Sequence, residues 1–231
     1  NKNIYPIKNH PLLAYTITTA IESEIFDSVI CATDDIKYAQ IAEYYGAEVP
    51  FLRTSSDTGD KSADIEWVTW LINELRIRKR VYDVFSILRP TSPLRQTSTI
   101  KRAFDKFYSC KEFDSLRAIE KCHEHPGKMW IVRDDNMFPL LPFSNDQVPW
   151  HSSQYDALPE IYVQNASLEI AWTKTITNKK SISGQLIIPF ITEMQEGFDI
   201  NYPDDIIKLN HLIESGEVKL PSILKKSYFD I

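Results

Sequence analysis

The chain has 231 residues, 43% of them hydrophobic and 25% charged, which is the composition of an ordinary soluble domain with a substantial core. Its formal net charge of −6 argues against binding to nucleic acid or to an anionic membrane surface, because either partner requires a field of Lys and Arg. No apolar run approaches the roughly 20 residues that span a bilayer, and the first residues do not resemble a secretory signal, so we expect a cytoplasmic protein.

Short apolar runs and helical patterns alternate through the first half of the chain. Helices are predicted over residues 12–23, 35–46, 62–80 and 97–107, and strands over residues 29–33, 47–52, 84–88 and 115–119. Pro11 lies at the first turn of the first helix and Gly46 follows the second, which are typical start and stop signals. The alternation predicts an α/β fold: a Rossmann-like, mostly parallel sheet with helices on both faces, whose ligands bind outside the carboxyl ends of the strands.

Residues 121–160 interrupt this regular pattern. They are rich in Trp, His and Pro, show little periodicity and are longer than a usual connection in a compact domain. A strand pattern resumes over residues 161–173, and an amphipathic helix is predicted over residues 205–216. We therefore expect a single domain over residues 1–231, in which residues 121–160 form an insertion that supplies a dimer contact, substrate contacts or both.

Two polar loops follow predicted strands at the edge of the sheet where ligands are expected. LRPTSPLR at residues 88–95 offers two hydroxyls and two guanidinium groups between stiffening prolines. RTSSDTGDKSADI at residues 53–65 concentrates a guanidinium group, hydroxyls and carboxylates before a helix. Each loop taken alone is also typical of a solvated turn with helix-capping residues.

The six glycines are too far apart to form a loop that cradles phosphate. If the protein binds a nucleotide, that loop must lie before Asn1, and we expect a strand and a basic, Gly-rich loop there. The three cysteines lack metal-ligand spacing and are predicted to be reduced thiols, so we expect no zinc site.

Several motifs occur in the order found in one family of enzymes, the acylneuraminate (CMP-sialic acid synthetase-like) cytidylyltransferases. PTSPLR at residues 90–95 and SSDTGDKSADI at residues 55–65 are similar to its central and nucleotide-contacting motifs. Lys2-Asn3 with PIKNHPLLAYTI resembles the segment after its Gly-rich loop. Four later motifs resemble the same family: HPGK at residues 125–128, Leu158-Pro159, Gln164-Asn165 and FDIN at residues 198–201.

The resemblance implies transfer of CMP from CTP to a hydroxyl of a nonulosonic acid or a related acidic sugar, with release of pyrophosphate. It places the nucleotide near Lys2, Asn3, Arg53, Ser62 and Arg89. It places the sugar near Lys128, Tyr155, Gln164 and Asn165, and Lys128 is also predicted to be a catalytic cation. Asp199 is predicted to be a catalytic carboxylate and a Mg²⁺ ligand, with Asn201 as a second oxygen ligand.

The sequence departs from the family at four places. Asn201 stands where an aspartate is usual, Arg89 where Gln is common and Ala166 where Gly is usual, and residues 154–156 lack an expected Arg. Two alternatives therefore stay open. One is a nucleotidyltransferase of the same fold that uses another nucleotide, sugar or sugar phosphate, and the other is a non-catalytic nucleotide-binding homologue, which rests on Asn201 alone.

The ring side chains of residues 121–160 have two interpretations each. His123 and His125 are candidate general bases, since imidazole titrates near neutrality, or structural residues of an oligomer-forming segment. Trp130 and Trp150 are expected to pack or to lie at an interface rather than to stack on a base. We predict a homodimer, because a segment this long and aromatic is unusual as an idle loop.

Overall fold

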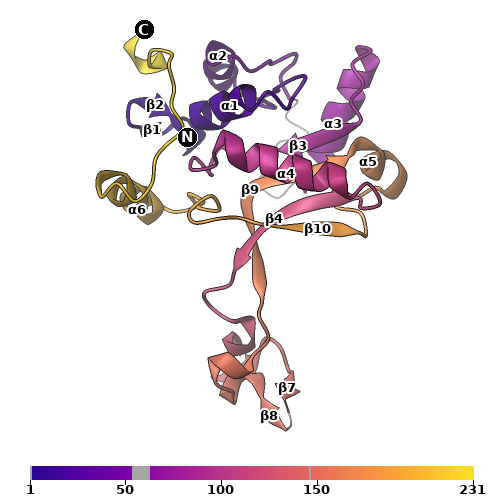
Figure 1. Ribbon diagram of the computed structural model, residues 1–231, viewed down its shortest axis with the longest axis vertical. Coiled ribbons are helices and arrows are strands. Elements are labelled where there is room, and N and C mark those ends of the chain that lie inside the picture. Colours follow the sequence, from indigo (N-terminus) through magenta and orange to yellow (C-terminus); the bar gives the residue numbers. More distant parts are fainter. Residues whose placement is uncertain (1, 54–62, 146) are drawn as a thin grey trace. The chain divides into compact units, whose positions relative to one another are not determined.

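The computed structural model describes residues 2–53, 63–145 and 147–231. The chain divides into two compact units, which we call the main unit and the insert unit (Figure 1). The main unit comprises Asn1–Ala118 and Asn165–Ile231, and the insert unit comprises Ile119–Gln164. The insert unit contains the whole irregular segment at residues 121–160.

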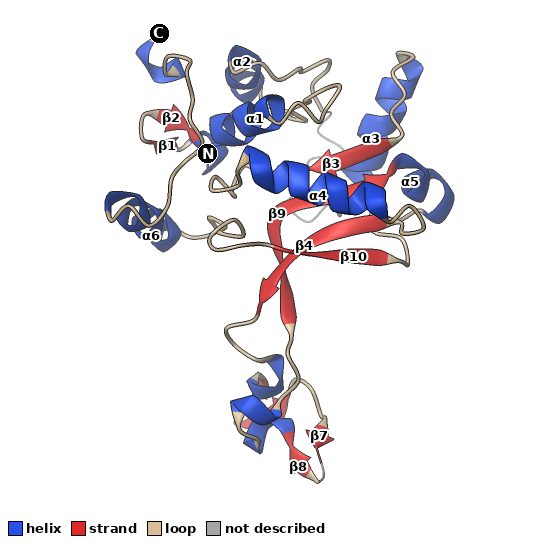
Figure 2. Ribbon diagram, in the orientation of Figure 1, coloured by secondary structure: helices blue, strands red, loops and turns tan. Residues whose placement is uncertain are grey.

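The main unit is built on a four-stranded sheet with the order β10-β4-β9-β3 (Figure 2). Its strands are β3 (Val84–Ile87), β4 (Ser115–Lys121), β9 (Tyr162–Trp172) and β10 (Ile187–Ile191). β3 runs antiparallel to β9, with Val84 opposite Trp172 and Ile87 opposite Glu169. The α/β class is confirmed, but this antiparallel pair makes the sheet mixed rather than mostly parallel, because no helical crossover directly links the two strands.

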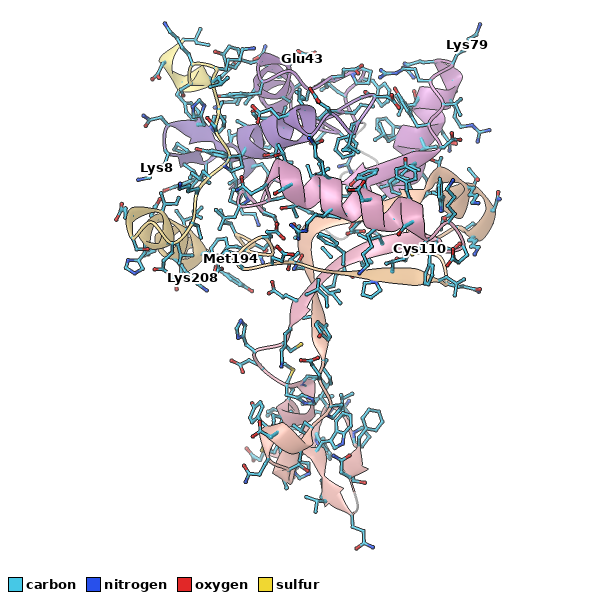
Figure 3. All side chains as sticks on the ribbon, viewed as in Figure 1. Lys8, Glu43, Lys79, Cys110, Met194 and Lys208 are labelled. Carbon is cyan, nitrogen blue, oxygen red and sulfur yellow. The ribbon has the colours of Figure 1, made fainter. Side chains whose placement is uncertain are left out.

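Helix α4 (Thr97–Ser109) packs on one face of the sheet, and side chains fill the space between them (Figure 3). Gln96 and Thr99 form a capping box at its start, and apolar residues recur every three or four positions along one side. The resulting core joins the helix to three strands and consists of Ile100, Ala103, Phe104, Phe107, Leu116, Ala118, Leu168, Ile170, Ile188 and Phe190.

The opposite face of the sheet is covered by two helices, α3 (Asp64–Ile77) and α5 (Thr173–Lys179). Paired residues of a ladder share a face and successive residues alternate, so Ile87 lies on the face opposite Ile170. Ile87 packs there with Val68 of α3 and Ile176 of α5. The prediction of helices on both faces is therefore confirmed.

Residues 29–33 and 47–52 were predicted to be strands, but they form a single parallel bridge between Ile30 and Glu48. Two hydrogen bonds hold it: the Cys31 N–H donates to the Glu48 carbonyl at 2.9 Å, and the Glu48 N–H donates to the Val29 carbonyl at 2.8 Å. Within the described ranges each of the two segments pairs only with the other. A pairing of two segments alone is marginally stable, so neither extends into a longer strand. Helices α1 (Leu12–Glu22) and α2 (Ile36–Tyr44) pack with this pair.

The last helix, α6 (Pro203–Glu214), follows the FDIN motif at residues 198–201. Ile200 of this motif and Leu209 of α6 are buried in one cluster with Leu94, which ties the motif to the loop at residues 88–95. The described part of the main unit also includes the short elements η1 (Lys2–Ile4), β1 (Pro6–Ile7), β2 (His10–Pro11) and η6 (Tyr228–Asp230). No helix of the described ranges is long and apolar enough to cross a membrane.

The described residues of the insert unit form two hairpins and three single-turn helices. They are β5 (Trp130–Arg133) with β6 (Asn136–Pro139), β7 (Ser144–Asn145) with β8 (Val148–Pro149), η3 (Pro126–Lys128), η4 (Trp150–Ser152) and η5 (Tyr155–Ala157). His125 is buried: its Nδ1 accepts from the Gly127 N–H at 2.9 Å, and its Nε2 lies 3.1 Å from the Pro159 carbonyl oxygen. Both ring nitrogens of His125 are engaged within the unit, which favours its structural interpretation, whereas His123 is exposed.

A buried carboxylate organises the turn that precedes β10. Asp114 accepts hydrogen bonds from the Lys179 ammonium group at 2.7 and 2.8 Å and from the backbone N–H groups of Gln185 and Leu186. Gly184 has a φ of +68°, and a Cβ at this position would lie 2.4 Å from the Asp114 side chain. The turn therefore excludes any side chain at residue 184.

These hydrogen bonds predict a stability that depends on acid pH. The hydrogen bond from Lys179, followed by those from the two backbone N–H groups, lowers the pKa of Asp114 to about 2. A lowered folded-state pKa gives stability that is fully present above the unfolded-state pKa of about 3.9 and is lost as the pH falls through the folded-state pKa. We expect the wild-type protein to lose about 1 kcal/mol more unfolding free energy than Asp114→Asn between about pH 4 and pH 2. Urea unfolding measures both losses, and equal losses would contradict the role of this carboxylate.

Candidate active site

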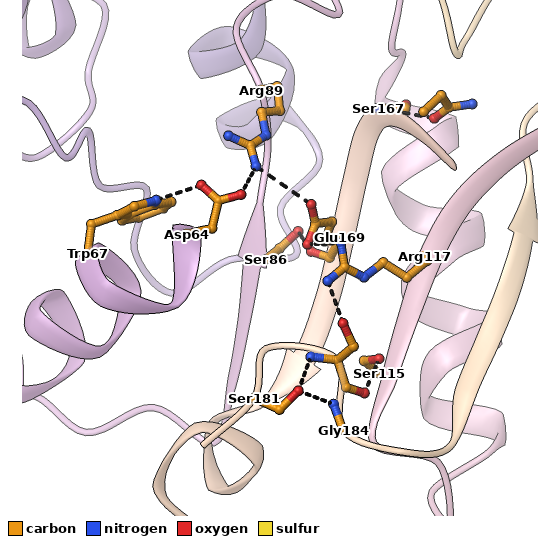
Figure 4. Close-up of polar contacts among 12 residues, drawn as sticks. Asp64, Trp67, Ser86, Arg89, Ser115, Arg117, Ser167, Glu169, Ser181 and Gly184 are labelled. Carbon is orange, nitrogen blue, oxygen red and sulfur yellow. Dashed lines mark hydrogen bonds and ion pairs between the residues drawn. The ribbon is translucent and has the colours of Figure 1, made fainter. Parts of the chain in front are cut away.

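Four charged side chains of the main unit form a continuous network (Figure 4). The Arg89 guanidinium forms an ion pair with Asp64 at the start of α3, and its Nη2 lies 3.8 Å from Glu169 Oε1 on β9. Arg117 Nη1 on β4 lies 2.5 Å from the other carboxylate oxygen of Glu169, and Arg117 also donates to Ser183 Oγ at 2.5 Å. The two cations and the two anions of the network neutralise each other, which lowers the free-energy cost of burying these charged side chains.

The surroundings of Arg89 favour its charged form. Burial alone would lower the pKa of Arg89, but its hydrogen bond to Asp64 and the negative charges of Asp64, Glu169 and Asp199 outweigh burial and raise this pKa. Because Asp199 contributes to this effect, it lies close enough to Arg89 for the two charges to interact. The guanidinium group is therefore a permanent cation with a fixed orientation.

Arg95 locks the loop at residues 88–95 in place. It is 1% exposed, and its guanidinium group donates to Thr16 Oγ1 of α1 at 2.9 Å, to the Arg89 carbonyl at 3.3 Å and to the Ser167 carbonyl of β9. Burial lowers the pKa of Arg95 to about 9, so the side chain stays cationic at neutral pH. The second guanidinium of the loop thus connects a helix, a strand and the backbone of Arg89 instead of facing a ligand.

The FDIN motif lies beside the same loop, because the Ile200 N–H donates to the Thr91 carbonyl at 2.9 Å. The Asn201 side-chain amide donates to Asp199 Oδ2 at 2.7 Å, so the structure brings the two predicted metal ligands together. Asp199 Oδ1 is buried and accepts no hydrogen bond from any described residue. Asp205 accepts instead from the N–H groups of Asn201 and Tyr202 at 2.8 Å and so caps α6. The described ranges contain no cluster of three or more His, Cys, Asp or Glu side chains suited to a metal.

Three of the five residues predicted for the nucleotide line one cavity of about 1150 Å³ in the main unit: Asn3, Arg53 and Arg89. The backbone N–H of Arg53 donates to the Thr33 carbonyl at 2.8 Å, and its guanidinium lies 5.9 Å from the centre of the Trp67 ring. Lys2 is exposed and does not line this cavity. Ser62 lies outside the described residues. The guanidinium groups of Arg53 and Arg89 thus line the cavity at the edge of the sheet where the ligand was predicted to bind.

Three of the predicted sugar-side residues, Lys128, Tyr155 and Gln164, belong to the insert unit. The Lys128 ammonium group donates to the carbonyl oxygens of His151, at 3.1 Å, and of Ser153, and it lies 5.5 Å from the centre of the Tyr155 ring. Gln164 is exposed. Asn165 belongs to the main unit, where its amide nitrogen donates to Thr192 Oγ1 at 2.9 Å.

Sequence reasoning missed Asp64, Glu169 and Arg117, which hold Arg89. One signal was available: Glu169 interrupts the apolar run SLEIAW of a predicted strand, and a carboxylate in such a run requires a partner. Its partners Arg117 and Arg89 depend on the pairing of β9 with β4 and with β3, which cannot be read from any of these strands alone.

Two solved structures share this fold. A CMP:2-keto-3-deoxy-manno-octonic acid synthetase complexed with CTP aligns over 93% of this chain and 92% of its own, with a TM-score of 0.65 and 11% identity. A 4-diphosphocytidyl-2C-methyl-D-erythritol synthase from Anaerococcus prevotii aligns over 92% of this chain and 93% of its own, with a TM-score of 0.61 and 11% identity. The fold is therefore the Rossmann-like α/β fold also seen in these two synthases.

Proteins related in sequence identify the family of this chain more narrowly than the fold does. An N-acylneuraminate cytidylyltransferase of Escherichia coli is 27% identical over 87% of this chain, which spans 45% of that protein. A pseudaminic acid cytidylyltransferase of Campylobacter jejuni is 34% identical, with 91% of this chain and 90% of the relative covered. A CMP-N,N'-diacetyllegionaminic acid synthase of Legionella pneumophila is 27% identical, with 95% and 92% covered. The sequence profile of the cytidylyltransferase family matches residues 1–166, and the chain belongs to this family.

Proposed function

We propose that the protein transfers CMP from CTP to a nonulosonic acid and releases pyrophosphate. One arrangement carries this proposal: Arg53 and Arg89 line a single cavity, and Asp199 lies within electrostatic reach of Arg89. Fixed cations of this kind stabilise the charge that develops on phosphoryl oxygens during transfer. The names of the Escherichia coli, Campylobacter and Legionella relatives support the nonulosonic acid as the sugar class.

The residues around Asp199 fit a magnesium ion. Its Oδ1 is buried without a hydrogen-bond donor among the described residues, as expected for an oxygen that awaits a cation. Mg²⁺ in nucleotide sites is held by one or two protein carboxylates, and substrate phosphates and water complete its shell. Asp199, assisted by the amide oxygen of Asn201, would hold the ion. An ion bound there would neutralise part of the negative charge of the triphosphate.

The sugar-side residues offer complementary chemistry for an acidic sugar. Lys128 provides a cation whose position is set by two backbone carbonyls and by the ring of Tyr155. A sugar carboxylate is attracted to such a cation, and the amides of Gln164 and Asn165 can bind hydroxyl groups. In this proposal Lys128 is both a binding residue and a catalytic cation.

The experiment that tests the proposal is a substrate panel. CTP, UTP, GTP and ATP are each combined with several nonulosonic acids, with a 3-deoxy-octulosonic acid and with sugar phosphates, and pyrophosphate release is measured. We expect turnover with CTP and a nonulosonic acid, and at most background release in the other combinations. Turnover only with another nucleotide or with a sugar phosphate would establish the alternative enzyme class. Binding of CTP without turnover of any sugar would indicate a non-catalytic homologue.

We also propose that the protein is a homodimer. Every residue of β5 is exposed, and the insert unit presents many large apolar side chains to solvent. They include Val132, which is 70% exposed, together with Met137, Phe138, Phe143 and Val148. An exposed apolar surface of this kind is typical of a protein–protein interface.

The dimer is expected to depend on the insert unit. Sedimentation at micromolar concentration should give twice the chain mass of 26.8 kDa for the wild-type protein. Val132→Arg should raise the dimer dissociation constant by at least about tenfold, because it places a charge in an apolar contact. Ile77→Arg, at a position that is 74% exposed on α3 of the main unit, is the matched control and should leave the mass unchanged. A monomeric wild-type protein would refute the proposal.

The proposed compartment is the cytoplasm. Cys31, Cys110 and Cys122 are all free thiols in the structure. Proteins of reducing compartments typically keep their cysteines in this state, which supports the proposal.

A further inference from the structure

The turn that leads from β10 to the FDIN motif is attached to α4 through the carboxylate of Glu196. Its two oxygens accept from the Arg102 guanidinium group of α4, at 2.9 and 3.0 Å. Thr99 Oγ1, in the first turn of α4, donates to the same carboxylate at 2.5 Å, and the backbone N–H of Glu193 donates to it at 2.9 Å. The two bonds from Arg102 have the paired geometry of the strong arginine–carboxylate contacts.

The contact between Arg102 and Glu196 is shielded from water on the side of the carboxylate. The Glu196 side chain is 12% exposed, and the Arg102 guanidinium group lies 5.3 Å from the centre of the Phe190 ring of β10. Burial alone would raise the pKa of Glu196, but its hydrogen bonds to Arg102 and Thr99 outweigh burial and lower this pKa. The carboxylate is therefore ionised at neutral pH, and the turn is fixed to α4 by a charged contact.

Local conformational preference does not set the shape of this turn. Met194 has a φ of +48°, in the left-handed region that residues other than glycine rarely adopt. Its side chain is 92% exposed (Figure 3), so its own packing does not hold this conformation. A backbone of this kind persists only when the surrounding structure determines it. Glu196 supplies the shielded contacts that hold the turn against α4.

Asp199 lies between this attachment and a second one. Glu196 is three positions before Asp199, and directly after Asp199 the Ile200 N–H donates to the Thr91 carbonyl at 2.9 Å. The loop that contains Thr91 leads directly into α4, which carries Arg102. Both attachments of the segment around Asp199 are therefore made to one continuous stretch of the chain.

We infer that Glu196 is a positioning residue for Asp199: through Arg102 and Thr99 it fixes the turn that places Asp199 Oδ1 for a cation. The inference rests on the proposed function, in which Asp199 holds a magnesium ion. Oδ1 accepts no hydrogen bond from the described residues, so its position depends on the backbone that carries it and on the bond from Asn201 to the other oxygen. Residues that orient a metal ligand typically change metal affinity or activity about 10- to 100-fold when they are removed.

Binding of Mn²⁺, measured with and without CTP by the relaxation of water protons, tests this role without any turnover. We expect Glu196→Ala to raise the dissociation constant of Mn²⁺ at least about tenfold. Arg102→Met should raise it to a similar extent, and the double variant should bind no more weakly than Glu196→Ala, because both changes remove the same contact. The magnesium concentration for half-maximal pyrophosphate release should rise in parallel, and saturating magnesium should restore the rate.

Two control variants separate positioning from stability. Asp114→Ala removes another carboxylate that binds a cation and is 10% exposed, so it should lower the melting temperature as Glu196→Ala does but leave the Mn²⁺ affinity unchanged. Glu193→Ala removes a carboxylate of the same turn that is 69% exposed and 3.5 Å from Arg102, and it should change neither quantity. If Glu196→Ala does not fold, Glu196→Gln replaces it. This variant sets an amide N–H against Arg102 and should weaken Mn²⁺ binding at least about threefold.

Several results would overturn the inference. They are a wild-type Mn²⁺ affinity in the Glu196 variant, an equal loss of affinity in Asp114→Ala, and additive effects of the changes at residues 102 and 196. A wild-type protein that turns over CTP, with the same magnesium dependence in the Glu196 variant, also overturns it and leaves the proposed function standing. A wild-type protein without turnover refutes the proposed function, and the Mn²⁺ affinities then decide the role of Glu196. A wild-type protein that binds no Mn²⁺ refutes that role.

Discussion

Asp199→Ala is expected to lower the rate of pyrophosphate release at least about a hundredfold, which corresponds to roughly 2.7 kcal/mol of lost transition-state stabilisation. The expectation follows from the buried Oδ1 of Asp199, which no described residue satisfies, and from the hydrogen bond that joins the neighbouring Ile200 to Thr91 of the loop that carries Arg89. The melting temperature should hardly change, because this carboxylate lies outside the four hydrophobic clusters. Initial rates measured against magnesium concentration give the result.

Two further variants make this test specific. Asp204→Ala is the matched control, since Asp204 is an exposed carboxylate in the first turn of α6, and its rate should stay close to the wild-type value. Asn201→Asp adds a second carboxylate next to Asp199 and should lower the magnesium concentration needed for half-maximal rate. Near-normal activity of Asp199→Ala, with an unchanged magnesium dependence, would show that the metal is held elsewhere.

Glu169→Ala is expected to lower the free energy of unfolding by about 3 kcal/mol, because it leaves two arginines without their shared, buried counter-ion. Glu169 is 6% exposed and lies 2.5 Å from Arg117 and 3.8 Å from Arg89. For a chain of this size the loss corresponds to a fall in melting temperature of roughly 6–12 °C. Thermal unfolding followed by circular dichroism measures it.

An exposed ion pair of the insert unit supplies the control for this variant. Glu160 lies 2.7 Å from Lys121, but both side chains are more than half exposed, so Glu160→Ala should leave the melting temperature nearly unchanged. Combining Glu169→Ala with Arg117→Met should recover part of the lost stability, because the unpaired cation is then removed as well. Equal melting temperatures for Glu169→Ala and Glu160→Ala would mean that the network does not stabilise the fold.

Helices α1, α2, α3, α4 and α6 could be predicted because their signals are local, whereas the short helix α5 was not predicted. The apolar spacing around Ile100 and Phe104 and the start at Pro11 each lie within a few neighbouring residues. The pairing of strands depends on distant segments and could not be predicted in the same way. VICAT at residues 29–33 has the composition of a buried strand, but in the described structure it has one partner segment and so forms only a bridge.

The residues of the candidate site also divide into those that a local motif predicts and those that depend on strand pairing. Asp199 and Asn201 were expected to act together, and the structure brings them together because they lie two positions apart in the segment before α6 and share a hydrogen bond. Arg89 was expected to face the nucleotide, and it does line the cavity, but its anchors Asp64 and Glu169 come from other elements and became visible only with the sheet register. Charge pairs of this kind follow from tertiary geometry, which the sequence pattern of one loop does not contain.

The network around Arg89 also restricts how this position can evolve. Arg89→Gln would leave the carboxylates of Asp64 and Glu169 without their shared cation. Asp64 would lose its ion pair and Glu169 would keep only Arg117, so the single exchange is destabilising even if the substrate tolerates it. A lineage that moves between the two residues must therefore first neutralise residue 64 or residue 169. The three positions should vary together rather than one at a time.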